Sequence, residues 1–239
     1  EQLSWAYGGS RGYKEFKYNS EDDRDLTPDE INAQWAEDKL SELASSDNKE
    51  PFFLAVGFVR PHTPLIAPQK YFDLYPLEDI QLANILENDK EDTFRNYITD
   101  YDTNLKDLEV KSSSLTHKQL KKRWIEMFEK LQNSYQDPNE GLRRFTQAYL
   151  ACVSAVDDNI GQVVNAIDNS ELKDNTIIVL VSDHGWTMGE KEHIYKNSPW
   201  EESTRIPMTI RVPGMTKTKG LVNHPVSLID IYPTLLELA

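Results

Sequence analysis

The stretch that most constrains this chain is an apolar run that ends abruptly in polar residues. Thr176 to Val181 are apolar or β-branched without interruption, which is typical of a strand buried on both faces. Asp183, His184 and Gly185 follow almost at once. Ligands of open α/β sheets collect at the carboxyl ends of such strands, so we expect chemistry at Asp183 and His184. The same three residues are locally compatible with a simple turn.

A second apolar run, residues 51–58, is also followed by polar residues. Arg60 and His62 come next, and Pro61 and Pro64 exclude a helix there and stiffen the loop. Two buried strands that each carry polar side chains at their carboxyl ends are the arrangement that a shared site requires. We therefore expect both loops at one edge of a sheet, although a histidine between prolines is also compatible with an ordinary surface loop.

Residues 28–45 predict an amphipathic helix. Thr27 and Glu30 can form a capping box, and Pro28 suits the first helical position. Apolar residues then recur at helical spacing, so one face of the helix is expected to be buried. That face would contain Ile31, Trp35, Leu40 and Leu43.

Residues 142–168 predict a longer helix, because apolar residues recur every three or four positions. A helix, a short loop and a buried strand make up half of a βαβ unit. Residues 206–214 predict a further strand with edge-like prolines, and residues 226–239 begin another helix. The predicted fold class is therefore α/β, a mixed sheet flanked by helices. The buried face of the long helix would contain Tyr149, Val153, Val156, Ile160, Val163 and Ile167.

The domain organisation is predicted from changes of composition. Residues 77–140 are rich in charged and polar residues and poor in glycine, which favours a helical insertion or lid joined through a flexible linker at 136–141. The chain begins without a methionine and stops within the expected helix at 226–239. We therefore expect residues 1–239 to be the C-terminal part of a single, partial catalytic domain.

Charge and cysteine content exclude several classes of function. The formal net charge of -14 would repel nucleic acid and anionic membranes, so neither is an expected partner. The single cysteine, Cys152, allows no internal disulfide and is predicted to be a buried, inert thiol. The sequence has no Gly-x-Ser-x-Gly elbow, no His-Glu-x-x-His, no glycine-rich phosphate loop and no Cys-x-x-Cys.

The residue types suggest specific roles at a shared site. Asp183 offers a hard oxygen ligand to a divalent cation, and His184 could ligate the cation or donate to a substrate. Lys196 could neutralise an anion, and His62 could act as a general acid. Taken singly, each has a plainer interpretation as a loop or solvated side chain.

Four segments together resemble the formylglycine-dependent (type I) sulfatases, in particular the iduronate-2-sulfatase-like branch. They occur in the order and spacing of that family. The first, with the sequence Pro-Phe-Phe-Leu-Ala-Val-Gly-Phe-Val-Arg-Pro-His-Thr-Pro, resembles its segment with an active-site histidine. The segments are residues 51–64, 149–161, 182–214 with Lys196 inside it, and 224–234.

The resemblance implies an alkaline-phosphatase-like α/β fold with one calcium ion at the carboxyl edge of the sheet. By that analogy Asp183 and His184 are metal ligands, and Lys196 and His62 are catalytic residues that contact the sulfate. His62 would also be the acid for the leaving alcohol. Arg60 would add positive charge for substrate binding. A nitrogen ligand is uncommon for calcium, so His184 leaves the identity of the metal slightly open.

The nucleophile of the family is missing from this chain. It is a Cys or Ser in Cys/Ser-x-Pro-x-Arg, oxidised to formylglycine, and neither Cys152 nor Ser198 fits that motif. The paired aspartates that complete the metal site are not identifiable either, because the Asp22–Asp23 pair follows no apolar strand. We therefore expect both in an N-terminal part of the same domain, and we expect the chain alone to be inactive.

The expected function is hydrolysis of sulfate esters on a sulfated sugar or polysaccharide, by a bacterial protein of the periplasm or the extracellular space. One alternative is a phosphodiesterase or phosphonate hydrolase of the same superfamily. Another is a sulfated-glycan binder without catalysis. The sequence does not identify the sugar, the position of its sulfate or the oligomeric state.

Overall fold

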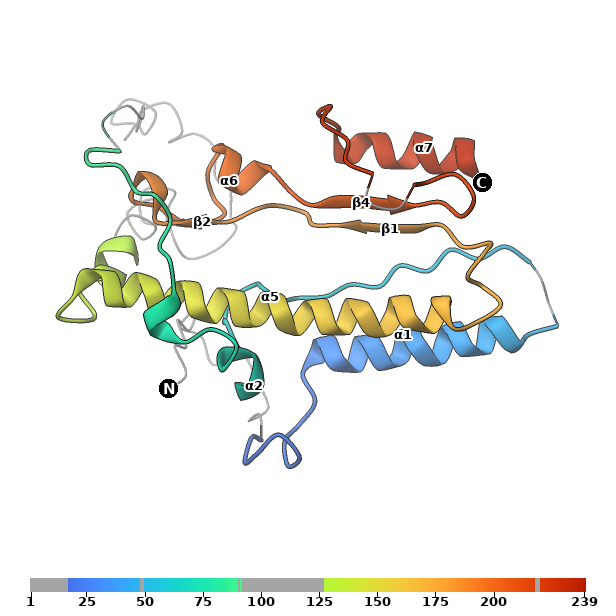
Figure 1. Ribbon diagram of the computed structural model, residues 1–239, viewed down its shortest axis with the longest axis horizontal. Coiled ribbons are helices and arrows are strands. Elements are labelled where there is room, and N and C mark those ends of the chain that lie inside the picture. Colours follow the sequence, from blue (N-terminus) through green and yellow to red (C-terminus); the bar gives the residue numbers. More distant parts are fainter. Residues whose placement is uncertain (1–16, 48–49, 90, 92–126, 218–219) are drawn as a thin grey trace, which may run out of the picture.

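A computed structural model describes residues 17–47, 50–89, 91, 127–217 and 220–239. Its elements form layers (Figure 1). The strand pair β1 (Ile178–Val181) and β4 (Met208–Arg211) lies between α7 (Ile231–Leu238) on one side and two long helices on the other. These helices, α1 (Pro28–Ser45) and α5 (Pro138–Asp168), pack along each other. The layering of helix, strand and helix confirms the predicted α/β class.

The remaining elements are short. The turns of helix are α2 (Gln69–Phe72), α6 (Glu201–Thr204), and the 3-10 helices η1 (Leu77–Asp79), η2 (Glu190–Glu192) and η3 (Leu228–Asp230). The short strands β2 (Thr187–Met188) and β3 (Ile194–Tyr195) pair antiparallel. Among the described residues, no helix combines the length and the apolar character needed to cross a membrane.

The bounds of α1 confirm the prediction, but its buried face was predicted only in part. The Thr27 hydroxyl accepts the Glu30 amide at 3.3 Å and the Glu30 carboxylate accepts the Thr27 amide at 2.7 Å, so the capping box is formed. Ile31 and Trp35 are more than half exposed. Leu40 is buried as predicted, and the other apolar residues of the buried stripe are Ala33 and Ala36. Small side chains allow α1 to approach α5 closely. This close packing, and not the size of the apolar side chains, determines which face of α1 is buried.

Helix α5 begins four residues earlier than predicted. Asp137 caps it by accepting the Asn139 amide at 2.9 Å, and Pro138 occupies the first turn. The expected linker at 136–141 is therefore partly helix. Gly141 explains the tight join to the preceding helical residues, 127–132, because an added Cβ would lie 2.4 Å from the Leu131 carbonyl oxygen.

The predicted buried face of α5 is only partly correct. Of the six apolar residues expected there, Ile167 is buried and Val153 is exposed. The fully buried positions in the middle of the helix are small, at Ala148, Ala151 and Cys152. Burial raises the pKa of the Cys152 thiol to about 12, so the prediction of a buried, unreactive cysteine is confirmed.

The strands at 178–181 and 208–211 confirm the two strand predictions around the central motif. They pair antiparallel, with Ile178 opposite Arg211 and Val181 opposite Met208. The prediction that β1 is buried on both faces is wrong for this structure, since Leu180 and Val181 are more than a third exposed. Among the described residues β1 has no partner other than β4, and burial of a strand requires neighbours on both edges.

The second apolar run, residues 51–58, is not a strand in this structure. It runs as an unpaired segment between α5 and β1 (Figure 1), and Phe53 is 86% exposed. Leu54 and Ile178 nevertheless pack against one buried cluster with Leu40, Ile167 and Leu172. The run therefore lies between the strand pair and the long helices, and its backbone forms no strand pairing among the described residues.

The expected insertion at 77–140 falls largely outside the described residues. The described part contains η1 and the helical residues 127–132, and residues 138–140 belong to α5. The role of this region as a lid stays a prediction.

Candidate active site

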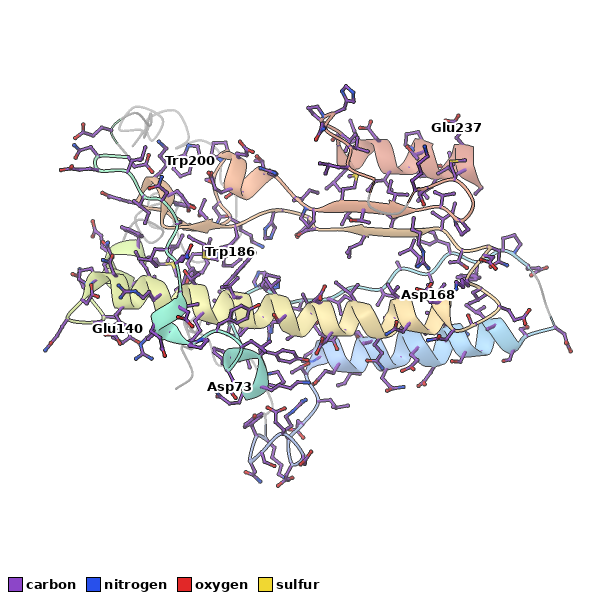
Figure 2. The ribbon with its side chains drawn as sticks, viewed as in Figure 1. Asp73, Glu140, Asp168, Trp186, Trp200 and Glu237 are labelled. Atoms are coloured by element: carbon purple, nitrogen blue, oxygen red, sulfur yellow. The ribbon has the colours of Figure 1, made fainter. Side chains whose placement is uncertain are left out.

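Three loops pack on a single core cluster. The cluster contains Leu65, Phe145, Ile194 and Tyr195, and Trp186 packs against it. Leu65 belongs to the loop after residues 51–58, Trp186 follows β1, and Tyr195 precedes Lys196. Figure 2 labels Trp186, which lies between the strand layer and α5. The shared cluster fixes the three loops relative to one another.

His62 lies on an exposed loop whose hydrogen bonds settle its tautomer. The Nδ1 atom is 2.6 Å from the Thr63 carbonyl oxygen, which can only accept, so Nδ1 carries the proton. The His62 amide also donates to the Val59 carbonyl at 2.9 Å and closes the turn. Nε2 is therefore the ring atom available to a substrate.

Arg60 is used within the same loop. Its Nε donates to the Ile66 carbonyl at 2.8 Å, and its Nη1 donates to the His62 carbonyl at 3.0 Å. The peptide bonds before Pro61 and Pro64 are both cis. The predicted substrate contact through Arg60 would have to use the guanidinium N–H groups that make neither of these hydrogen bonds.

Asp183 and His184 converge at the end of β1. The carboxylate Oδ2 lies 3.5 Å from the His184 Nε2, and the Asp183 side chain is 83% exposed. His184 Nδ1 is 2.8 Å from the Gly185 carbonyl, so Nδ1 carries the proton and Nε2 is free to bind. One oxygen and one nitrogen at this separation can share a cation.

The backbone holds this turn rigidly. The Gly185 amide donates to the Ser203 carbonyl at 2.7 Å, and the Trp186 amide donates to the Glu202 carbonyl at 2.5 Å. A Cβ on Gly185 would lie 2.1 Å from the Glu202 carbonyl oxygen, so only glycine permits this approach. The position of Asp183 and His184 thus depends on α6.

The two donors fit only part of a metal shell. Calcium takes six to eight oxygen ligands. Within the described ranges no group of three or more His, Cys, Asp or Glu side chains could hold a metal ion. Asp183 and His184 suit a divalent cation by their chemistry, and any further carboxylate, histidine or cysteine ligand would have to come from outside the described residues.

Lys196 follows a loop of unusual backbone conformation. Lys191, Glu192 and Tyr195 all have positive φ, at 55°, 53° and 78°. Such residues cost energy and tend to occur at functional sites. Within the part of the chain that the structure describes, the Lys196 ammonium makes no hydrogen bond or ion pair, so it is available to an anion.

Two contacts hold the Lys196 loop. The Thr187 hydroxyl, fully buried, donates to the Tyr195 carbonyl at 2.5 Å. The Asp89 carboxylate accepts the Lys191 ammonium at 2.7 Å and the Lys191 amide at 2.9 Å. Trp186 stacks at 6.3 Å on His184 and contacts Tyr195 edge-on at 5.3 Å, measured between ring centroids. The Asp183–His184 turn and the Lys196 loop are therefore adjacent.

Sequence reasoning missed Asp29 and Thr187. Asp29 is 2% exposed, and its carboxylate accepts the amides of Val59 and Arg60 at 2.7 and 2.9 Å. In the sequence it is an ordinary acid in the first turn of a helix. Thr187 lies inside the motif after β1, but only the pairing of β2 with β3 reveals its partner.

The comparisons with known proteins point to one family. A family profile described as "Sulfatase" matches residues 2–239. A sulfatase of Formosa agariphila is 40% identical over 215 residues, 90% of this chain and 36% of that protein. Human iduronate 2-sulfatase is 31% identical over 190 residues, 79% of this chain and 31% of that protein. The chain thus spans about a third of the length of these relatives.

Solved structures share the fold. The crystal structure of yidJ from Bacteroides fragilis has a TM-score of 0.57 at 27% identity, covering 87% of this chain and 36% of that one. A phosphonate monoester hydrolase of Silicibacter pomeroyi has a TM-score of 0.59 at 21% identity, covering 86% of this chain and 37% of that one. At 21% identity the likeness concerns the fold alone. Together they confirm the predicted alkaline-phosphatase-like architecture.

Proposed function

This chain belongs to the sulfatase family, whose members hydrolyse sulfuric esters, and from that premise we propose that the whole protein is a metal-assisted sulfatase acting on a sulfated sugar or polysaccharide. The supporting observation is the shared core cluster, on which the loops of His62, His184 and Lys196 pack. A sulfate ester requires neutralised non-bridging oxygens and a proton for the leaving oxygen. These three loops carry the residue types for both tasks.

Each residue has a distinct proposed task. Lys196 would bind the non-bridging oxygens with its unpaired ammonium. His62 would hold a proton on Nε2 and give it to the leaving alcohol, while Nδ1 stays bonded to Thr63. Arg60 would add positive charge beside the sulfate.

Asp183 and His184 would hold a calcium ion, through Oδ2 and Nε2. When bound, the ion would polarise the sulfate and offset the charge that develops on it. The formylglycine nucleophile and the remaining ligands are expected in the N-terminal part of the same domain.

That N-terminal part is also the proposed partner of the strand layer. Residues 51–58 have no ladder, and β1 has one partner among the described strands. Exposed Phe53, Leu180 and Val181 would be buried by further strands. Addition of strands there would supply the hydrogen bonds that both segments lack.

The proposed substrate class draws on the relatives. An ulvan-active sulfatase of Formosa agariphila is 41% identical over 100 residues, 41% of this chain and 20% of that protein. A polyanionic substrate would meet a chain of net charge -14, so the local charge of Lys196, Arg60 and the metal would have to dominate. A periplasmic or extracellular location in a bacterium would suit such a substrate.

The proposal is tested on the protein expressed with its native upstream region. Sulfate release from sulfated polysaccharides is measured with and without a chelator, alongside hydrolysis of a phosphonate monoester. Peptide mass mapping determines whether a Cys/Ser-x-Pro-x-Arg peptide carries an aldehyde. We expect chelator-sensitive release of sulfate and the aldehyde mass, and no release from residues 1–239 alone.

Three results would redirect the assignment. Preferred cleavage of the phosphonate would place the protein with the phosphonate hydrolases. Glycan binding without turnover would make it a binder. Turnover by residues 1–239 alone would refute the expected location of the nucleophile.

A further inference from the structure

A buried carboxylate sits behind the loop that carries His62. Asp29 lies in the first turn of α1, yet neither of its oxygens bonds to an amide of that turn in the hydrogen bonds of the described residues. The capping is done by Thr27 and Glu30. Both oxygens of Asp29 accept amides some thirty residues away, at Val59 and Arg60. Asp29 therefore connects the helix to the loop and does not stabilise its own helix end.

The loop is also held from its other side. Arg60, whose amide Asp29 binds, donates from its side chain to the carbonyls of Ile66 and His62. The Arg60 side chain thus spans the loop, and the Asp29 carboxylate fixes the backbone from which it starts. Because His62 lies two residues further, its ring position depends on both contacts.

The start of α1 is itself anchored, so that Asp29 can serve as a fixed point. Arg24 forms a bidentate ion pair with Glu30, with N–O distances of 2.8 and 2.6 Å. Glu30 also closes the capping box. Charge-assisted pairs of this geometry are stronger and more directional than neutral hydrogen bonds.

Asp29 has no access to substrate. The cavity beside it is lined by Thr27, Arg60, Tyr71 and Asn159 and has room for about one water molecule. A sugar sulfate does not fit there. Asp29 can affect catalysis only through the loop.

We infer that Asp29 and Arg60 are positioning residues, which set the Nε2 atom of His62 at the leaving oxygen of the substrate. The inference rests on the proposed sulfatase function and on His62 as the acid. Displacement of a catalytic group by about 1 Å can cost on the order of 10²-fold in rate. Loss of the Asp29 contact with the Val59 and Arg60 amides would therefore slow proton donation without removing any group that touches the substrate. A change at Arg60 would also alter the proposed positive charge beside the sulfate, so Asp29 gives the cleaner test.

The test uses leaving groups of different quality. Asp29→Asn keeps the size of the side chain but leaves one oxygen, and Arg60→Lys keeps the charge but cannot reach both carbonyls. Both are made in the protein with its native upstream region, with Asp38→Asn, an exposed acid on the same helix, as the matched control. kcat/KM is measured for an alkyl sulfate, which needs a proton, and for nitrophenyl sulfate, which needs it far less.

We expect kcat/KM for the alkyl sulfate to fall about 10- to 100-fold in both variants, and that for nitrophenyl sulfate to fall less than about threefold. The amides of Val59 and Arg60 should exchange with deuterium faster in Asp29→Asn. Asp38→Asn should leave both rates and exchange unchanged. An equal fall for both substrates would overturn the inference, because it would indicate a structural role only.

Unchanged exchange at Val59 and Arg60 in Asp29→Asn would also overturn it. If Asp29→Asn does not fold, Arg60→Lys still tests the inference, through the ratio of kcat/KM for the alkyl sulfate to kcat/KM for nitrophenyl sulfate. If the wild-type protein cleaves no sulfate ester, the proposed function fails. The exchange measurement then tests the Asp29 contact on its own.

Discussion

Two aspartates beside the ends of the two apolar runs have opposite surroundings. Asp29 is 2% exposed, and both of its carboxylate oxygens accept hydrogen bonds from backbone amides of this chain. The Asp183 side chain is 83% exposed, and its one polar partner among the described residues is the His184 ring, at 3.5 Å. The helical side of the site is thus completed by this chain, and the strand side is left open to a ligand. Substitutions should separate the two cases: loss of Asp29 should lower stability as well as activity, whereas loss of Asp183 should lower activity alone.

The largest effect is expected at the open carboxylate. Asp183→Asn removes a charged ligand of the proposed cation, and metal assistance is worth several kcal/mol, so kcat/KM should fall on the order of 10³-fold. Because the side chain is exposed, the midpoint of thermal unfolding measured without metal should not change. Asp174→Asn, an exposed acid before β1, is the matched control and should leave the rate unchanged. A large loss of stability in metal-free Asp183→Asn would contradict the proposed contrast between the exposed Asp183 and the buried Asp29.

Substitution of the buried carboxylate, unlike that of Asp183, should lower the stability of the protein. Asp29→Ala leaves the amides of Val59 and Arg60 without acceptors, and each unsatisfied buried group costs about 1–3 kcal/mol. We expect the free energy of unfolding to fall by about 2–4 kcal/mol in denaturant titrations. Asp38→Ala, on the exposed face of α1, should change it by less than about 0.5 kcal/mol. Equal effects at the two positions would show that the hydrogen bonds from the Val59 and Arg60 amides to Asp29 do not stabilise the fold.

Two glycines of α5 compare a packed position with an open one. A Cβ on Gly141 would lie 2.4 Å from the Leu131 carbonyl oxygen, while a Cβ on Gly161 meets no atom within 4 Å. Gly141→Ala should therefore destabilise the protein by about 1–3 kcal/mol. Gly161→Ala should stabilise it by about 0.5–1 kcal/mol, because alanine favours the helix. Unfolding in denaturant measures both, and a stabilising Gly141→Ala would contradict the close packing.

What the sequence predicted correctly was mostly local. The capping box at Thr27 fixed the start of α1, and the apolar run at 178–181 was found as a strand because both signals lie within a few residues. The candidate residues Asp183, His184 and Lys196 were proposed from one continuous segment, and their roles stay predictions. The predicted buried faces of the helices were wrong at positions where packing against a segment distant in sequence determines which side chains are buried. Ile31 and Trp35 are exposed, whereas the small residues Ala33 and Ala36 are buried in the helix that packs along α5.

Long-range partners account for the rest. Burial of β1 depends on strands on both edges, and only β4 provides one among the described residues. Asp29 has the pattern of an ordinary first-turn acid, and its role is set by amides thirty residues away. No periodicity or motif encodes that pairing.

The smallest effect concerns the Lys196 loop on the open side. Hydrogen bonds from the Lys191 ammonium, and then from its amide, hold the pKa of Asp89 below its ordinary value. The contact therefore contributes stability above the pKa of an unfolded aspartate, about 3.9, and loses it as pH falls through the lower folded value. The chemical shift of the Lys191 amide should stay constant from pH 7 to 5 and change only below about 4. Asp89→Asn should abolish that titration, and a midpoint above the pKa of the unfolded chain would contradict the contact.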